Sequence, residues 1–335
     1  MRVPRAYRLG LAATALGAWF MQLAADRRAI RADPRDRELR VAVSGKALAV
    51  ASSDGTPLHV LQFGSPDAPA TVVLVHGWTC AARIWTAQIR ALAGPGLRVI
   101  AYDLRGHGKS GRPDPADYSI DAHAADLDAV LDAVLHDGQR AVVAGHSLGG
   151  MAIVAWAGRH PGKAKRLLAG AALVNTGMDG LIAESPLLRA PQRLSRLRHV
   201  LLSLVLGAAM PLPKGSTPLS HRVIRWVALS RSASPAEIAF CERIVLGCNR
   251  DVRALCGDTL SGLDLYQSIA SLDVPTVIIG SEDDMLTAPS HVRRLADALP
   301  HVVQEIIVPD CGHMTLVSRS EAVTEPIRRL VRDHG

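Results

Sequence analysis

The stretch RAVVAGHSLGGMAIVAWAGRH, residues 140–160, decides the fold of this chain. It begins with a continuous apolar run, passes through Gly145-His146-Ser147-Leu148-Gly149-Gly150 and continues as an apolar helical segment. Strand, sharp turn and helix are the context in which the G-x-S-x-G pattern holds an exposed serine on a strained turn. Glycines on both sides let the backbone turn tightly and let the helix approach the strand. We therefore expect Ser147 to be a nucleophile at the end of a buried strand.

Strand-like and helical segments alternate on both sides of this stretch. Strand-like runs lie at 41–50, 57–63, 71–75, 97–102, 140–145, 167–174, 274–280 and 302–308. Those near 71, 97, 140 and 274 are continuously apolar, which is typical of strands covered on both faces. Residues 121–135 have apolar positions at helical spacing and predict an amphipathic crossover helix. This alternation predicts an α/β fold with a doubly wound, mostly parallel sheet.

One long interval breaks the alternation. Residues 176–264 have helical periodicity and prolines but no convincing core strand, and they include the basic-then-apolar segment RLSRLRHVLLSLVLGAAM at 193–210. A structureless connection of this length is rare in a compact domain, so we expect a helical cap insertion. The expected organisation is an N-terminal hydrophobic segment and linker (1–38), a core formed by 39–175 and 265–335, and a cap at 176–264.

The N-terminus carries an uncharged, mostly apolar run at residues 9–25, with arginines on both flanks and a polar linker at 26–38. Three interpretations remain open: a membrane anchor, a cleaved signal peptide, or a helix packed on the catalytic domain. The first is favoured, so we expect a membrane-associated protein, with secreted and cytoplasmic locations as alternatives. Basic residues on both sides leave the orientation unreadable.

Charge and composition narrow the class of partner and cofactor. The net charge is +7, but the basic residues are scattered, aromatic residues make up 4% and no nucleic-acid motif is present. We expect no nucleic-acid partner, and an anionic membrane surface accounts better for the basic excess. The sequence has no phosphate loop, dinucleotide fingerprint or Cys/His cluster at zinc spacing, so we expect no cofactor and no metal. The five irregularly spaced cysteines predict small buried residues, with one bridge within 241–256 left open.

Five motifs follow one another along the chain: His76-Gly77-Trp78, DLRGHGKS from Asp103, GHSLGG from Gly145, Gly280-Ser281-Glu282-Asp283, and Gly312-His313. In this order they make the chain resemble the α/β-hydrolase superfamily, and within it bacterial serine esterases and lipases with a helical cap. The resemblance spans roughly residues 55–325, outside the N-terminal segment and the cap. The order serine, acid, histidine is the one that this fold uses.

The resemblance implies a catalytic triad of Ser147, Asp283 and His313. His313 lies in a loop after a strand-like run, and Asp283 follows the strand-like run at 274–280, although Glu282 and Asp284 are neighbouring acids that leave the choice open. The backbone N–H groups of Trp78 and Leu148 are the expected oxyanion donors, with Trp78 alternatively a core aromatic. Packing or turn roles are expected for Asp103, His107, His123 and His146.

The implied activity is cleavage of carboxylic esters, of apolar or lipid-like acyl groups, through an acyl-enzyme on Ser147. Serine in place of aspartate at this turn disfavours dehalogenase and epoxide hydrolase chemistry. The same triad could serve cofactor-free haloperoxidase or perhydrolase chemistry, or hydrolysis of C–C or amide bonds. Two further alternatives are a binding protein on a hydrolase scaffold and a membrane-tethered scaffold. The natural substrate and the oligomeric state stay open.

Overall fold

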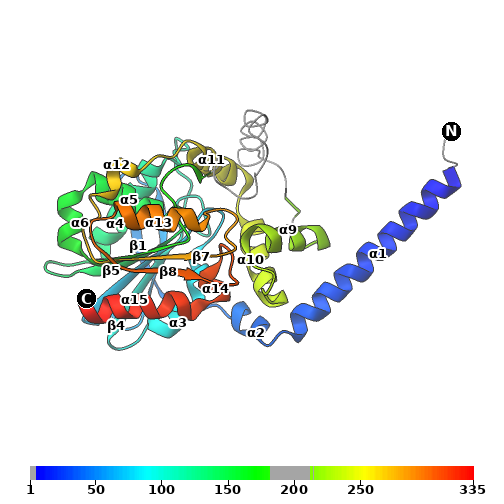
Figure 1. Cartoon of the computed structure of the whole chain (residues 1–335), viewed down its shortest axis with the longest axis horizontal. Coiled ribbons are helices and arrows are strands. Elements are labelled where there is room, and N and C mark those ends of the chain that lie inside the picture. Colours follow the sequence, from blue (N-terminus) through cyan, green and yellow to red (C-terminus); the bar gives the residue numbers. More distant parts are fainter. Residues whose placement is uncertain (1–4, 182–211, 214) are drawn as a thin grey trace.

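An eight-stranded sheet with helices on both faces forms the body of the protein (Figure 1). The computed structural model describes residues 5–181, 212–213 and 215–335, with the backbone alone for residues 5–13, 15 and 16. The strands, in sheet order, are β1 (Lys46–Ala51), β2 (Pro57–Phe63), β4 (Leu97–Tyr102), β3 (Ala70–Val75), β5 (Ala141–His146), β6 (Leu168–Val174), β7 (Thr276–Ser281) and β8 (Val302–Val308). The pairs β1–β2 and β2–β4 are antiparallel and the others are parallel, which confirms the predicted fold class.

The central strands are apolar throughout because both of their faces are covered. In β3, Val73 and Val75 join the core on one face, while Val72 and Leu74 join the core on the other. The first core includes residues of α4 (Ile120–Val134), α5 (Leu148–Arg159) and α13 (Pro289–Ala298), and the second includes residues of α3 (Thr86–Leu92) and α15 (Ser320–His334). Figure 1 shows these two helical layers above and below the sheet.

The predicted strands agree closely with those of the structure. The main difference is the first run, predicted from residue 41, because β1 begins at Lys46. The predicted helix at 121–135 is α4. Shorter elements complete this part of the chain: η1 (Ala82–Trp85), α6 (Pro161–Leu167) and α14 (Thr315–Ser318).

The described residues between β6 and β7 contain helices and no strand, as expected for the interval at 176–264. They form α9 (Pro218–Ala228), α10 (Pro235–Gly247) and α11 (Arg250–Ser261), followed by α12 (Tyr266–Ile269). Thr217 and Ser234 each begin a helix with a capping box and a proline at the first turn, a strong local start signal. The segment at 193–210 lies outside the described residues. We keep the name predicted cap for residues 176–264.

Helix α1 (Arg5–Ala32) projects away from the body, and near its C-terminal end it contacts α2 (Arg35–Arg40), α9 and α10 (Figure 1). It is longer than the apolar run at 9–25, because most of the predicted polar linker at 26–38 is helical, in α1 and α2. Alanine and arginine are good helix formers, and α1 ends just before Asp33-Pro34, since a residue preceding proline disfavours helix. Within the described residues, no helix combines the length and apolarity needed to cross a membrane.

The chain that follows α1 is fastened to the body at a junction of polar contacts. Arg35 forms an ion pair with the buried carboxylate of Glu237 on α10, and its Nη2 donates to the carbonyl oxygen of Val317 on α14 at 3.0 Å. Asp33 accepts a hydrogen bond from the backbone N–H of Ala236 at 2.9 Å. The junction therefore ties the start of the chain to both the predicted cap and the core.

Candidate active site

Ser147 occupies a strained turn between β5 and α5. Its backbone angles are φ 52° and ψ −120°, a conformation that non-glycine residues rarely adopt. Its N–H donates to the carbonyl oxygen of Val174 at 2.9 Å, and its own carbonyl oxygen accepts from the Thr176 hydroxyl at 2.8 Å. A Cβ on Gly149 would lie 2.3 Å from the carbonyl oxygen of Val75, so the turn requires glycine there. These contacts hold the serine in the geometry of a nucleophile elbow.

His313 lies in the loop between β8 and α14, and only 3% of it is exposed. The ring of His146, the residue before Ser147, lies with its centroid 4.8 Å from that of His313. Nε2 of His146 is 3.0 Å from the carbonyl oxygen of His313. These contacts bring the histidine loop against the residue that precedes Ser147.

The carboxylate that meets His313 belongs to Asp284, which corrects the choice of Asp283. Oδ2 of Asp284 lies 2.9 Å from Nδ1 of His313, and Asp284 is fully buried, whereas the side chains of Asp283 and Glu282 are exposed. The reason lies in the turn after β7. Ser281 points inward and donates to the carbonyl oxygen of Gly312, and the chain returns to the same side at Asp284.

Local hydrogen bonds hold the Asp284 carboxylate in place. It accepts from the backbone N–H groups of Leu286 and Thr287 at 2.8 and 2.9 Å, from the Thr287 hydroxyl at 2.7 Å and from Nδ2 of Asn175 at 2.9 Å. Burial acts to raise the pKa of Asp284, but the charge of His313 and these hydrogen bonds outweigh it and lower the pKa. The group is therefore held as a carboxylate.

Sequence analysis missed Asn175 and Thr287. A local signal for Thr287 existed. An aspartate side chain commonly accepts hydrogen bonds from backbone N–H groups two or three residues further along the chain, and Thr287 stands three residues after Asp284. Asn175 stands at the end of β6 with φ 44°, a conformation that asparagine tolerates. Nothing in the sequence alone places its amide beside a carboxylate more than a hundred residues away.

The two predicted oxyanion donors lie next to the serine turn. Leu148 is the first residue of α5, where a backbone N–H has no partner within the helix. The loop with Trp78 passes close to Ser147, since a Cβ on Gly77 would lie 2.9 Å from Cβ of Ser147. The Trp78 indole donates to the carbonyl oxygen of Arg253 on α11 at 3.0 Å, so its side chain also anchors the predicted cap.

Asp103 and the neighbouring histidines make structural contacts. Asp103 accepts from the backbone N–H groups of Ala82 and Lys109 at 2.7 and 2.9 Å. Nε2 of His107 accepts from the Thr79 N–H at 3.3 Å. Burial lowers the pKa of both His107 and His146 to about 3, so both rings are neutral near pH 7. His123 is likewise fully buried, and desolvation lowers its pKa.

A cavity of about 760 Å³ lies beside the carboxylate loop. Its walls include Asp283 and Met285, which flank Asp284 in the chain, together with Arg222, Arg225 and Trp226 of α9. Leu229 also lines it and packs on the histidine loop, since a Cβ on Gly312 would lie 2.6 Å from the Leu229 carbonyl carbon. The cavity therefore stands between the predicted cap and the loops of Asp284 and His313.

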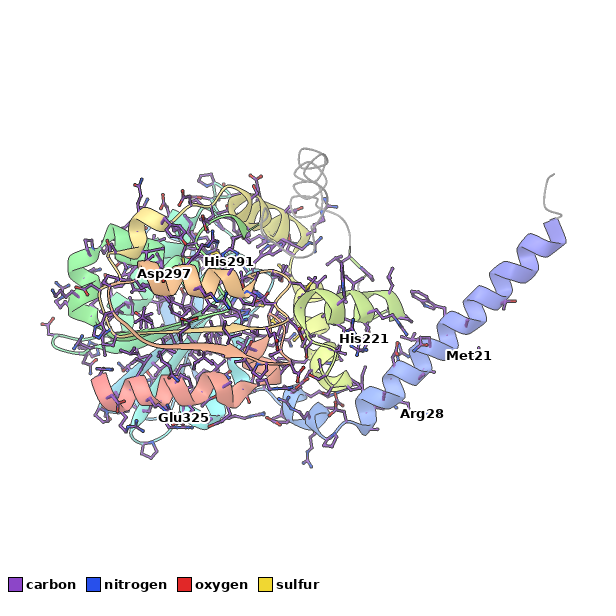
Figure 2. All side chains as sticks on the ribbon, viewed as in Figure 1. Met21, Arg28, His221, His291, Asp297 and Glu325 are labelled. Carbon is purple, nitrogen blue, oxygen red and sulfur yellow. The ribbon has the colours of Figure 1, made fainter. Side chains whose placement is uncertain are left out.

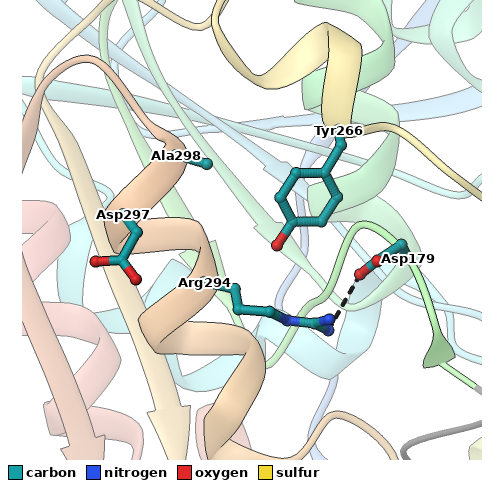
Figure 3. Close-up of a pocket in the computed structure, with 5 residues that line it drawn as sticks. All are labelled: Asp179, Tyr266, Arg294, Asp297 and Ala298. Atoms are coloured by element: carbon teal, nitrogen blue, oxygen red, sulfur yellow. Dashed lines mark ion pairs between the residues drawn. The ribbon is translucent and has the colours of Figure 1, made fainter.

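A second cavity, of about 360 Å³, has a different character (Figure 3). Arg294 crosses it to pair with Asp179 at 3.1 Å, and its guanidinium carbon lies 6.0 Å from the centre of the Tyr266 ring. Its lining contains none of the candidate catalytic residues.

All five cysteines are free, so no bridge joins the residues at 241–256. Four are buried and Cys248 is half-buried, in agreement with the prediction of small buried residues. Burial raises the pKa of Cys80 to about 12. The thiol of Cys80, two residues after Trp78, is therefore uncharged and is no rival nucleophile.

Comparison with known proteins gives a consistent relationship. A family model described as alpha/beta hydrolase fold matches residues 70–320. The chain is 29% identical over 273 residues to a non-heme haloperoxidase from Rhodococcus erythropolis, covering 79% of this chain and 92% of that protein.

Two solved structures extend the likeness in three dimensions. A thermophilic esterase from Thermogutta terrifontis has a TM-score of 0.68 and 22% identity, over 88% of this chain and 100% of that one. A membrane phospholipase A described as a bacterial virulence factor has a TM-score of 0.66 and 20% identity, over 98% of this chain and 97% of that one. At these identities both establish the fold alone.

Proposed function

Because the chain belongs to the α/β-hydrolase fold family, we propose that it is a serine hydrolase that cleaves carboxylic esters through an acyl-enzyme on Ser147. The observation that carries the proposal is the buried His313–Asp284 pair packed against the strained turn of Ser147. A serine hydroxyl needs a base within reach, and the base needs an orienting carboxylate. Asp284 supplies the orienting carboxylate for His313, and we propose His313 as the base for Ser147.

In the proposed mechanism, Asp284 holds Nδ1 of His313, which leaves Nε2 to take the proton from Ser147 Oγ. The alkoxide attacks the ester carbonyl, and the backbone N–H groups of Trp78 and Leu148 receive the oxyanion. The tetrahedral intermediate collapses as His313 returns the proton to the leaving alcohol. Water, deprotonated by His313, then releases the acid and restores Ser147.

For the substrate we propose a small-molecule ester with an apolar or lipid-like acyl group. The cavity beside Asp284 supports this, since Trp226, Leu229 and Met285 offer an apolar wall close to the reacting loop. We retain the predicted cap as the lid over this site. We also propose that residues 9–25 associate with a membrane surface, because Trp19, Phe20 and Met21 are exposed there at 40%, 63% and 70%.

The test combines a fluorophosphonate probe with p-nitrophenyl esters. The wild-type protein is expected to be labelled by the probe. Its activity on the esters should persist or rise as the acyl chain lengthens from acetate toward octanoate. A Ser147→Ala variant should lose both labelling and turnover while keeping its circular dichroism spectrum. Failure of a folded wild-type protein to react with the probe would remove the serine-hydrolase proposal.

The second candidate is perhydrolysis by the same triad, and the similarity to a haloperoxidase favours it. In that reaction hydrogen peroxide replaces water as the attacker of the acyl-enzyme and releases a peracid. One assay distinguishes the two activities by measuring the peracid and the free acid formed from the same ester at increasing peroxide concentration. A perhydrolase should form an increasing share of peracid.

A further inference from the structure

Helix α9 presents apolar side chains on two opposite faces. Ala228 lies on the inner face and is buried at 4% exposure, while Leu219, Val223 and Trp226 are exposed at 63%, 45% and 61%. Their spacing of four and three residues places these three on one stripe of the helix. Single exposed apolar residues are ordinary, but three on one stripe, one of them a tryptophan, form a patch that needs a partner.

The segment that carries this stripe is basic. Residues 218–232 contain no aspartate or glutamate, and they contain Arg222, Arg225 and Arg231. Arginines beside a tryptophan and aliphatic residues are the composition of helices that lie in the headgroup region of a bilayer. An exposed apolar stripe with a basic border is complementary to an anionic lipid surface.

The patch continues toward α1. The two helices are in contact, and the guanidinium of Arg222 lies 3.8 Å from the carboxylate of Asp26. Figure 2 shows Met21 and Arg28 on α1 beside the helix that carries His221. Trp19, Phe20 and Met21 of α1 are also exposed apolar residues.

We propose that the stripe Leu219–Val223–Trp226 of α9 docks on the surface of an anionic lipid bilayer. A second copy of the chain fits less well. A two-fold contact through this stripe would set Arg225 and Arg231 against the same two residues of the other copy, and like charges repel. Anionic headgroups would instead neutralise them.

Docking in this way places the cavity beside Asp284 at the lipid surface. Trp226 belongs to the stripe, Arg222 and Arg225 border it, and all three residues line the cavity. An ester leaving the bilayer would reach the cavity without crossing bulk water. This last step rests on the proposed ester hydrolase function, whereas the docking itself does not.

The experiment uses the full chain carrying Ser147→Ala, which stops turnover, and Trp19→Phe, which leaves Trp226 as the exposed tryptophan among the described residues. Vesicles of phosphatidylcholine with or without phosphatidylglycerol are prepared with brominated acyl chains. We expect the protein to sediment with the anionic vesicles and its fluorescence to be quenched there. Sedimentation without quenching would overturn the docking of α9, and so would no sedimentation at all.

Variants separate the apolar and charged contributions. Leu219→Ser with Val223→Ser should lower the partition coefficient for anionic vesicles about tenfold, since two apolar side chains no longer enter the lipid. Arg222→Gln with Arg225→Gln should lower it by a similar factor for anionic vesicles alone. The matched control, Leu255→Ser with Val303→Ser, removes two apolar residues exposed at 41% and 43% elsewhere and should change nothing.

Two further outcomes decide the case. Equal partition of the stripe variant and the control would overturn the proposal, and so would a vesicle-free dimer that shields Trp226 from iodide. The Leu219→Ser, Val223→Ser protein with Ser147 restored should hydrolyse soluble p-nitrophenyl acetate as the wild type does. If the wild type has no ester activity but Trp226 is quenched, the proposed function fails and the docking stands.

Discussion

Asn175 and Asp284 meet across neighbouring strands: Nδ2 of Asn175 lies 2.9 Å from Oδ2 of Asp284, the same oxygen that faces Nδ1 of His313. Asn175 also reaches the hydroxyl of Ser281 at 2.6 Å. The amide thus helps to fix where the carboxylate stands, and Asn175 is a positioning residue for the proposed triad.

Replacing Asn175 with alanine or glycine should lower kcat about tenfold with little change in KM, because one hydrogen bond to a charged group is lost. Glycine accepts the positive φ of this position, so equal losses in both variants exclude backbone strain as the cause. Asn175→Asp should be worse, since a second carboxylate beside Asp284 raises the pKa of the pair. Steady-state kinetics from pH 5 to 9 measure both effects, and an unchanged kcat in all three variants would contradict the role.

The correction at the carboxylate loop leads to a direct comparison of Asp284 and Asp283. Asp284→Asn should lower kcat by about 10⁴, as the loss of an orienting carboxylate does in comparable triads. Asp283→Asn changes an exposed side chain and should stay within about threefold of the wild type. Hydrolysis of p-nitrophenyl butyrate measures both, and the reverse ranking would restore Asp283 as the catalytic acid.

The buried histidines make the protein sensitive to mild acid. The folded-state pKa values of His107 and His146 are about 3, below the ordinary value of 6.5, so below pH 6.5 the unfolded chain binds protons that the folded chain does not. The contribution of these two histidines to stability is therefore complete above pH 6.5 and is lost as the pH falls toward 3. The two groups together should lower the free energy of unfolding by roughly 2 to 3 kcal/mol per pH unit.

Urea unfolding at pH 7, 6 and 5 measures this slope. His146→Gln should reduce the number of protons taken up on unfolding by about one, which makes the slope shallower. His136→Gln changes an exposed residue and should leave the slope unchanged. A free energy of unfolding that does not depend on pH in this range would show that these rings are charged in the folded protein.

The tight turn at Ser147 predicts a cost for any side chain at Gly149. A methyl group there would meet the carbonyl oxygens of Val75 and His76 at 2.3 and 2.7 Å, so Gly149→Ala should lose about 3 kcal/mol of stability. The matched control is Gly162→Ala in α6, where a Cβ has nothing within 4 Å. It should be neutral or stabilise the protein by up to about 1 kcal/mol. Equal melting temperatures for the two variants would contradict the packing described here.

The sheet could be predicted from the sequence because its central strands are mostly apolar runs, and that pattern arises from burial on both faces. The position of Ser147 could be predicted because Gly145 and Gly149 stand two residues before and after it, in the pattern G-x-S-x-G. The choice among Glu282, Asp283 and Asp284 could not, since three adjacent acids have the same local pattern and only the path of the turn decides which one points inward. The helical state of residues 26–32 could not be predicted, since a charged, polar composition is common to exposed helices and to linkers.

The junction at Arg35 has a mechanical consequence. Asp33 and Arg35, directly after the end of α1, contact α10 and α14, so the base of α1 is fixed to the body of the protein. A surface that binds α1 would therefore also orient the body of the protein. Val317, which accepts one of these hydrogen bonds, lies four residues after His313, so the junction that holds α1 is also close in the chain to the histidine loop.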